Sequence, residues 1–137
     1  MDSPQFAKPL TILVVDDEAP IRNTVADILK MEGMRAITAA DGHAAIEQFR
    51  AQPVAINLVL LDLFMPGMDG VDVLRELRAI DANVQVILFS GYAEREISKL
   101  LNDNNIVAFL PKPFQIHQLL TQIQRVLQPL SESTRPE

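Results

Sequence analysis

The chain contains no cysteine, so neither a disulfide framework nor a thiolate metal site can form. Its longest apolar stretches are about six residues, whereas a helix that crosses a bilayer needs about twenty. The short N-terminus has no basic flank leading into an apolar signal core, and no lipidation motif is visible. We therefore expect a cytoplasmic protein that makes no contact with a membrane.

Positive charge is also scarce. Twelve Lys and Arg residues stand against eighteen Asp and Glu residues, which gives a net charge of −6 and a pI near 4.8. Such a chain is repelled by phosphate backbones and by anionic lipid surfaces. Direct binding to nucleic acid is therefore not expected.

The hydrophobic pattern predicts one α/β domain. The 137 residues, 48% of them hydrophobic, can bury one core but leave no room for a second domain. Short runs rich in Val, Ile and Leu alternate with longer segments of helical spacing, and the runs show little polar alternation. That pattern favours a parallel sheet covered by helices on both faces. The expected strands are residues 10–15, 35–39, 57–61, 84–89 and 106–110.

A helix is predicted after each strand. Pro20 suits the first turn of the first helix, Gly33 suits its end, and Asp41 is expected to start the second helix. The apolar positions expected to face the core are Ile21, Val25, Ile28 and Leu29; Ala45, Ile46 and Phe49; Val71, Leu74 and Leu77; Ile97, Leu100 and Leu101; and Ile116, Leu119, Leu120, Ile123 and Leu127. Residues 1–8 and 128–137 are expected to be flexible, the latter as a tail or the start of a linker.

Polar residues stand where the apolar strands end. Asp16 and Asp17 follow the first strand, Asp62 the third, Ser90 the fourth, and Lys112 lies just beyond the fifth. In doubly wound sheets, ligands bind outside the carboxyl ends of the strands. Carboxylates beside a hydrophobic interior need a metal, a cation or a shared proton. The pattern therefore predicts one site made of three acids, a hydroxyl and an ammonium group.

These groups suit phosphoryl chemistry. A hard divalent cation, most naturally Mg²⁺, relieves the repulsion among three carboxylates and can also hold a phosphoryl oxygen. With an ammonium group on a second oxygen, an aspartate can attack phosphorus and become an acyl phosphate. We expect Asp62 to be that nucleophile.

Four segments resemble the receiver domain of two-component response regulators, and they occur in order at the expected strand ends. They are Val14–Glu18, Leu61–Gly70, Phe89–Tyr92 and Phe109–Phe114. The resemblance covers about residues 9–127. It implies a CheY-like, flavodoxin-like fold with five parallel strands in the order 2-1-3-4-5 and five helices.

The resemblance also implies a role for each site residue. Asp62 would accept the phosphoryl group. Asp17 and Asp62 would bind Mg²⁺ directly together with the backbone carbonyl of Phe64, and Asp16 would act through a coordinated water. Ser90 and Lys112 would contact the phosphoryl group.

A conformational switch is implied as well. Ser90 would move toward the phosphoryl group and Phe109 would fill the space it leaves, which changes the surface of helix four, strand five and helix five. Phe109 can also be read as an ordinary buried strand residue. The family further implies a cis bond between Lys112 and Pro113, since X-Pro bonds carry a small cis penalty.

The implied function is a phosphorylation-controlled signalling switch. It would take its phosphoryl group from a histidine kinase or phosphotransfer protein, act on an output partner that the sequence does not identify, and catalyse only its own phosphorylation and dephosphorylation. A haloacid-dehalogenase-type phosphatase is a rival, but that family carries a second acid two residues after the nucleophile, where this chain has Phe64. A receiver-like module that is never phosphorylated is a third possibility, although all five site positions are filled.

Single residues also allow simpler interpretations. Asp16, Asp17 and Glu18 precede a helix, where acids interact favourably with the macrodipole and with free amides. Ser90 could mark a helix start and Lys112 a solvated loop cation. Only their combination at neighbouring strand ends favours a shared site.

Phe64 and Tyr92, two residues after Asp62 and Ser90, are bulky enough to shield an acyl phosphate from water. If they do so, the double variant Phe64→Asn with Tyr92→Ala will lose its phosphoryl group faster than the wild type. Intact-protein mass spectrometry after removal of the phosphodonor measures this decay. A decay no faster than in the wild type would show that the two side chains do not shield the site.

Overall fold

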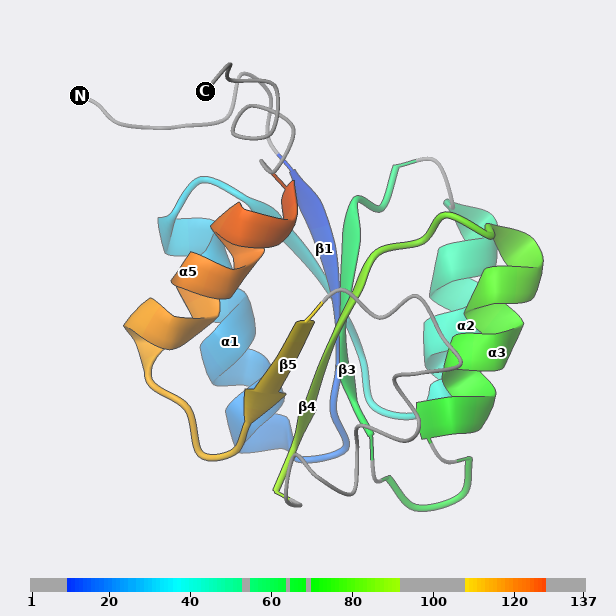
Figure 1. Ribbon diagram of the computed structural model, residues 1–137. Helices are drawn as coiled ribbons and strands as arrows, with labels where there is room; N and C mark the ends of the chain where they lie inside the picture. The colour runs from blue at the N-terminus through cyan, green and yellow to red at the C-terminus, as the bar shows by residue number, and fades with distance from the viewer. Residues whose placement is uncertain (1–9, 53–54, 64, 69, 92–107, 128–137) are drawn as a thin grey trace, which may run out of the picture.

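The computed structural model describes residues 10–52, 55–63, 65–68, 70–91 and 108–127. All pairings between its strands are parallel, and the strand order is β2-β1-β3-β4-β5, as expected (Figure 1). The range predicted for β2 is exact, and those for β1, β3 and β4 differ from the structure by one or two residues at an end, so that β3 includes Asp62 itself. β5 extends one residue beyond its predicted end, and its predicted first residues, 106–107, lie outside the described residues. They are β1 (Thr11–Val15), β2 (Arg35–Ala39), β3 (Leu58–Asp62), β4 (Val86–Ser90) and β5 (Ala108–Pro111).

Helices cover both faces of this sheet. The four in the described part of the chain are α1 (Ala19–Met31), α2 (Gly42–Ala51), α3 (Gly70–Ile80) and α5 (Ile116–Leu127). Figure 1 shows α1 and α5 on one face and α2 and α3 on the other. The fold is therefore the predicted doubly wound parallel sheet. The predicted helix with Ile97, Leu100 and Leu101 lies outside the described residues, as do the ends 1–8 and 128–137.

The predicted helix signals are confirmed. Pro20 stands in the first turn of α1, and Gly33 just beyond its end has a φ of +88°, a conformation that favours glycine. Asp41 is the N-cap of α2, where its Oδ1 accepts a hydrogen bond of 2.8 Å from the Ala44 amide. These local rules fix where two of the covering helices meet the sheet.

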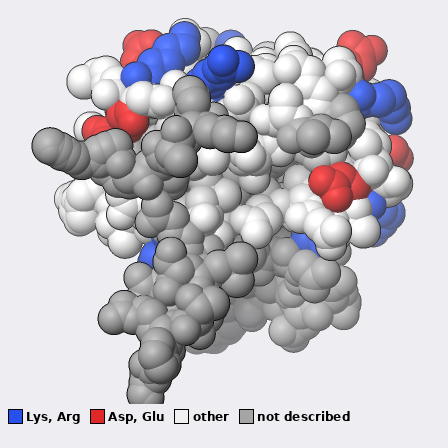
Figure 2. All heavy atoms as spheres, turned by 90° about the horizontal axis from the view of Figure 1, so that it is seen from above, with Lys and Arg blue, Asp and Glu red and all other residues white. Residues whose placement is uncertain are grey.

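Positively and negatively charged side chains are interspersed around the face of the molecule that Figure 2 shows. In that view, from above Figure 1, Lys and Arg side chains lie near Asp and Glu side chains around the rim. No patch of one sign forms there over the described residues. None of the described helices is both long and apolar enough to cross a membrane.

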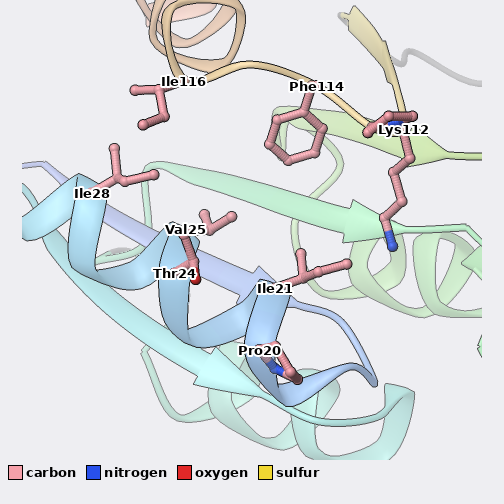
Figure 3. Close-up of a pocket in the computed structure, with 9 residues that line it drawn as sticks. Pro20, Ile21, Thr24, Val25, Ile28, Lys112, Phe114 and Ile116 are labelled. Carbon is pink, nitrogen blue, oxygen red and sulfur yellow. The ribbon is translucent and has the colours of Figure 1, made fainter.

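Among the described residues, one predicted core residue is exposed. Ile116 was expected to face the core from the last helix, but 55% of its surface is accessible to solvent. It is the first residue of α5 and lines an open cavity of about 550 Å³ between α1 and α5, across from Ile28 (Figure 3). The other predicted core positions of α5 are buried or half-buried, but the first residue of the helix borders the cavity. The cavity lining is Pro20, Ile21, Thr24, Val25, Ile28, Lys112, Pro113, Phe114 and Ile116.

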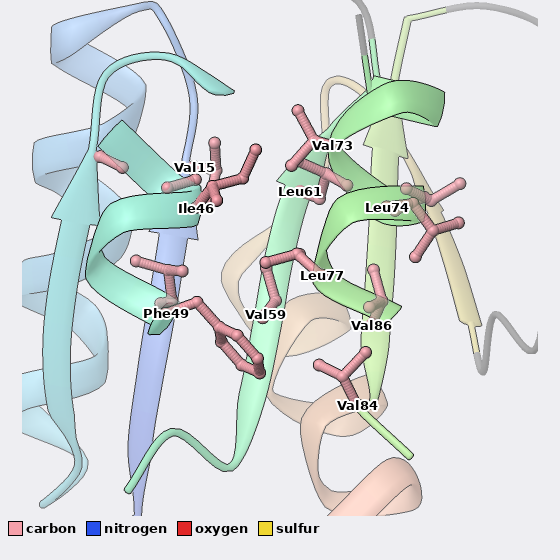
Figure 4. Packing of buried hydrophobic residues seen from close by; sticks show 14 of the residues in the cluster. Val15, Ile46, Phe49, Val59, Leu61, Val73, Leu74, Leu77, Val84 and Val86 are labelled. Carbon is pink, nitrogen blue, oxygen red and sulfur yellow. The ribbon is translucent and has the colours of Figure 1, made fainter. Parts of the chain in front are cut away.

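The alternation of strand side chains builds one hydrophobic cluster on each face. In β1, Leu13 and Val15 pack toward α2 and α3, whereas Ile12 and Val14 belong to the cluster formed with α1 and α5. Figure 4 shows the first cluster, in which Phe49 of α2 lies near β3. Strands that are buried on both faces explain the nearly continuous apolar runs in the sequence.

The loop after β3 is closed by a tight contact. The Gly70 amide donates a hydrogen bond of 2.7 Å to the Leu63 carbonyl. A Cβ atom on Gly70 would lie 2.6 Å from both the Cα and the carbonyl oxygen of Leu63. Glycine is therefore required here, and its contact holds the start of α3 against the residue that follows Asp62.

We expect Gly70→Ala to lower the free energy of unfolding by about 1–3 kcal/mol, because the added methyl group must displace backbone atoms of Leu63. Urea unfolding followed by circular dichroism measures the change. Gly91→Ala is the matched control, since a Cβ at Gly91 would meet no atom within 4 Å. Equal stabilities of the two variants would show that the contact at Gly70 relaxes without cost.

Candidate functional site

The predicted site residues meet at the carboxyl edge of the sheet, the lower edge in Figure 1. Asp16 and Asp17 follow β1, Asp62 ends the neighbouring strand β3, and Lys112 follows β5. Asp16 continues the alternation of Ile12 and Val14, so strand geometry places it on the α1 and α5 face. Residues far apart in the chain thus converge at one edge.

Lys112 joins two buried carboxylates. Its Nζ lies 3.0 Å from Asp16 Oδ2 and 3.1 Å from Asp62 Oδ2. Asp16 is fully buried, and Asp62 is 4% exposed. The ammonium group also lies 5.3 Å from the centre of the Phe89 ring, within reach of a cation–π interaction. The ion pairs with Lys112 thus offset the cost of burying the two acids. Loss of either partner would leave a buried charge uncompensated.

The backbone holds Lys112 in this position. Its amide donates a hydrogen bond of 2.8 Å to the Ser90 carbonyl at the end of β4. The peptide bond between Lys112 and Pro113 is cis, as the family resemblance implied. Only 17% of the Lys112 side chain is exposed, so this lysine is not a solvated loop cation.

The surroundings of Lys112 favour its charged form. Burial alone lowers the pKa of Lys112, but its contacts with Asp16 and Asp62 and their negative charges outweigh that effect and raise the pKa above its ordinary value of 10.5. The side chain is therefore a cation at neutral pH.

Asp16 is held by three further hydrogen bonds. Its Oδ1 accepts 2.8 Å from the Glu18 amide, its own amide donates 3.2 Å to the Ala39 carbonyl, and its carbonyl accepts 2.7 Å from Arg22 Nη1. The side chain of Glu18, the N-cap residue of α1, caps no amide. The hydrogen bond to the amide at the start of α1 thus occupies Oδ1 of Asp16, whereas Oδ2 forms the ion pair with Lys112.

Sequence reasoning missed Arg22. A lone arginine in the first turn of a surface helix looks like an ordinary solvated cation, and a main-chain carbonyl has no sequence signature. The only signal was its position, one helical turn after the acidic residues.

The three acids can hold a cation. Carboxylate oxygens of Asp16, Asp17 and Asp62 lie within 4.8 Å of one another, and Asp17 is exposed to solvent. The single charge of Lys112 cannot neutralise three carboxylates, and Asp16 Oδ2 accepts no well-aligned hydrogen bond within the described part of the chain. An oxygen-only ligand set with excess negative charge fits a hard ion such as Mg²⁺.

Ser90 and Phe109 lie on the other face of the sheet. Val86 and Leu88 of β4 belong to the cluster under α2 and α3, so alternation assigns Ser90, which is 1% exposed, to that face. Phe109 packs against the same cluster, opposite Leu88 in the sheet register. Phe64 and Tyr92 lie outside the described residues.

Comparisons with known proteins identify the family of the chain. The family model for the response regulator receiver domain matches residues 12–124. Sporulation initiation phosphotransferase F of Bacillus subtilis is 31% identical over 116 residues, which cover 85% of this chain and 92% of that protein. Sensor kinase CckA of Brucella abortus is 36% identical over 118 residues, which cover 86% of this chain but only 12% of the kinase.

Solved structures share the fold. CheY in a CheX–CheY–BeF3–Mg complex from Borrelia burgdorferi superposes with a TM-score of 0.81 at 30% identity, covering 87% of this chain and 90% of that one. The residues matched by the family model include the strand ends that carry the acids and Lys112. The chain therefore belongs to the family of response regulator receiver domains.

Proposed function

We propose that this receiver domain, a phosphorylation-controlled signalling switch by family, accepts its phosphoryl group on Asp62 in the presence of Mg²⁺. The observation that carries the proposal is the shared contact of Lys112 with Asp16 and Asp62, beside the exposed carboxylate of Asp17. Together these residues would supply a nucleophile, a fixed cation and a cluster of metal ligands at one edge of the sheet.

Asp62 is suited to be the nucleophile. A carboxylate oxygen of Asp62 forms a bond to phosphorus while the bond from phosphorus to the donor group breaks, and Lys112 offsets negative charge on the phosphoryl oxygens. Asp16, Asp17 and Asp62 would hold Mg²⁺, which when bound neutralises charge on the carboxylates and the phosphoryl group.

The donor is proposed to be a phosphohistidine of a histidine kinase or phosphotransfer protein. Two matched relatives carry the names of a sensor kinase and a phosphotransferase, which supports this class of partner. The phosphatase alternative lacks support, because Phe64 occupies the position at which that family carries its second acid.

The output step is proposed to run through Ser90 and Phe109. Ser90 ends the strand next to Asp62, and Phe109 packs on the same face of the sheet to which alternation assigns Ser90. Movement of Ser90 toward a phosphoryl group on Asp62 would open space near the strand that carries Phe109, changing the surface of β5 and α5. The output partner would bind the changed surface.

Incubation with acetyl phosphate and Mg²⁺ should add the mass of one phosphoryl group to the intact protein, and Asp62→Asn should abolish the addition. Asp72→Asn is the matched control, because Asp72 is an acid on the exposed side of α3, paired with Arg75. The adduct should also vanish when EDTA removes the metal. An adduct of full yield on Asp62→Asn would place the phosphoryl group elsewhere.

Asp17→Asn tests the acidic cluster against the helix-capping interpretation. In metal-free buffer we expect the variant to gain roughly 0.5–1 kcal/mol in free energy of unfolding, because one of three mutually repelling carboxylates is removed. Added Mg²⁺ should stabilise the wild type but not the variant. Urea unfolding with and without Mg²⁺ measures both effects.

Asp27→Asn, on the exposed side of α1, is the control for loss of an acid outside the cluster. The capping interpretation predicts the opposite sign for Asp17→Asn, a loss of stability, since the acid would then interact favourably with the helix N-terminus. A less stable Asp17→Asn variant in metal-free buffer would therefore contradict the cluster.

A further inference from the structure

The carboxylate of Asp17 is the least anchored group of the acidic site. Asp17 is exposed, whereas Asp16 and Asp62 are buried and contact Lys112. Within the part of the chain that the structure describes, no hydrogen bond or ion pair holds the Asp17 side chain. The position of its carboxylate therefore depends on the backbone that carries it.

One side chain fixes that backbone from α1. Arg22 Nη1 donates a hydrogen bond of 2.7 Å to the carbonyl oxygen of Asp16, which belongs to the peptide unit that leads directly into Asp17. The Arg22 amide donates 2.9 Å to the Glu18 carbonyl, so the same residue also closes the first turn of α1. Arg22 thus binds the acidic segment on both sides of Asp17.

We infer that Arg22 is a positioning residue for divalent-cation binding, which it promotes by fixing the Asp16–Asp17 peptide so that Asp17 faces Asp16 and Asp62. This inference rests on the proposed Mg²⁺ site. Arg22 contacts neither the metal ligands' carboxylate oxygens nor the nucleophile in the described contacts, and it acts through the main chain.

The charge of Arg22 would by itself have the opposite effect. A guanidinium cation near a divalent cation repels it, so removal of the charge alone would tighten metal binding. Loss of a group that orients ligands weakens metal binding, typically by 10–100-fold for partners that directly support a ligand. The sign of the change in affinity therefore separates positioning from simple electrostatics.

The test is titration of the full chain with MgCl₂ by isothermal calorimetry. Arg22→Met keeps the apolar stem and removes the hydrogen bond and the charge, and we expect Mg²⁺ binding about 10-fold weaker than in the wild type. Arg75→Met, which removes an exposed arginine paired with Asp72 on α3, is the matched control and should bind within about twofold of the wild type.

Arg22→Lys provides a second variant. A lysine ammonium can donate to the same carbonyl, so this variant should bind Mg²⁺ at least about threefold more tightly than Arg22→Met. Because lysine restores the unfavourable charge, only a restored hydrogen bond can produce that gain. A lysine variant that binds no more tightly than the methionine variant would overturn the inference.

Two further outcomes are decisive. If Arg22→Met binds Mg²⁺ as tightly as the wild type or more tightly, Arg22 does not position the site, even when the variant unfolds at a lower urea concentration. If the wild type itself binds no Mg²⁺, the proposed function fails at its metal site and this inference fails with it. The wild-type titration thus distinguishes the two failures.

Discussion

The contact of one lysine with two buried aspartates is the interaction on which the rest of the site depends. Asp16 directly follows β1 and Asp62 ends the adjacent strand β3, both inside the hydrophobic layer, where an isolated carboxylate costs several kcal/mol. Lys112 compensates both at distances of 3.0 and 3.1 Å. Once Asp17 is counted, three carboxylates face one ammonium group, so two negative charges stay uncompensated, and this excess charge favours binding of a cation at this edge of the sheet.

The carboxyl edge of the parallel sheet borders the hydrophobic clusters on both faces of the sheet. Asp16 lies on the side of α1 and α5, while Phe109, and by alternation Ser90, lie on the side of α2 and α3. An event at Asp62 therefore adjoins two separately packed clusters. Closely packed interiors switch between discrete arrangements more readily than they deform, which suits a domain whose output is a change of surface.

How far the sequence could predict this structure varied with the kind of signal. Strand-end acids such as Asp62 and the caps Asp41 and Gly33 follow local rules and were predicted, whereas the strand order came from the family resemblance. Ile116 was assigned to the core because periodicity reports the face of a helix but not what lies beneath its first residue. Arg22 and the close approach at Gly70 involve backbone atoms as partners, and backbone atoms leave no pattern in the side-chain sequence.

The position of Lys112 late in the chain, directly after β5, has a consequence for synthesis of the protein. Asp16 and Asp62 leave the ribosome before Lys112, the lysine that compensates them, so the two acids stay hydrated until β5 docks beside β4. Contacts between residues so distant in sequence form slowly, because the intervening chain must first be closed into a loop. A truncated product that ends before β5 consequently carries Asp16 and Asp62 without the cation that compensates their burial.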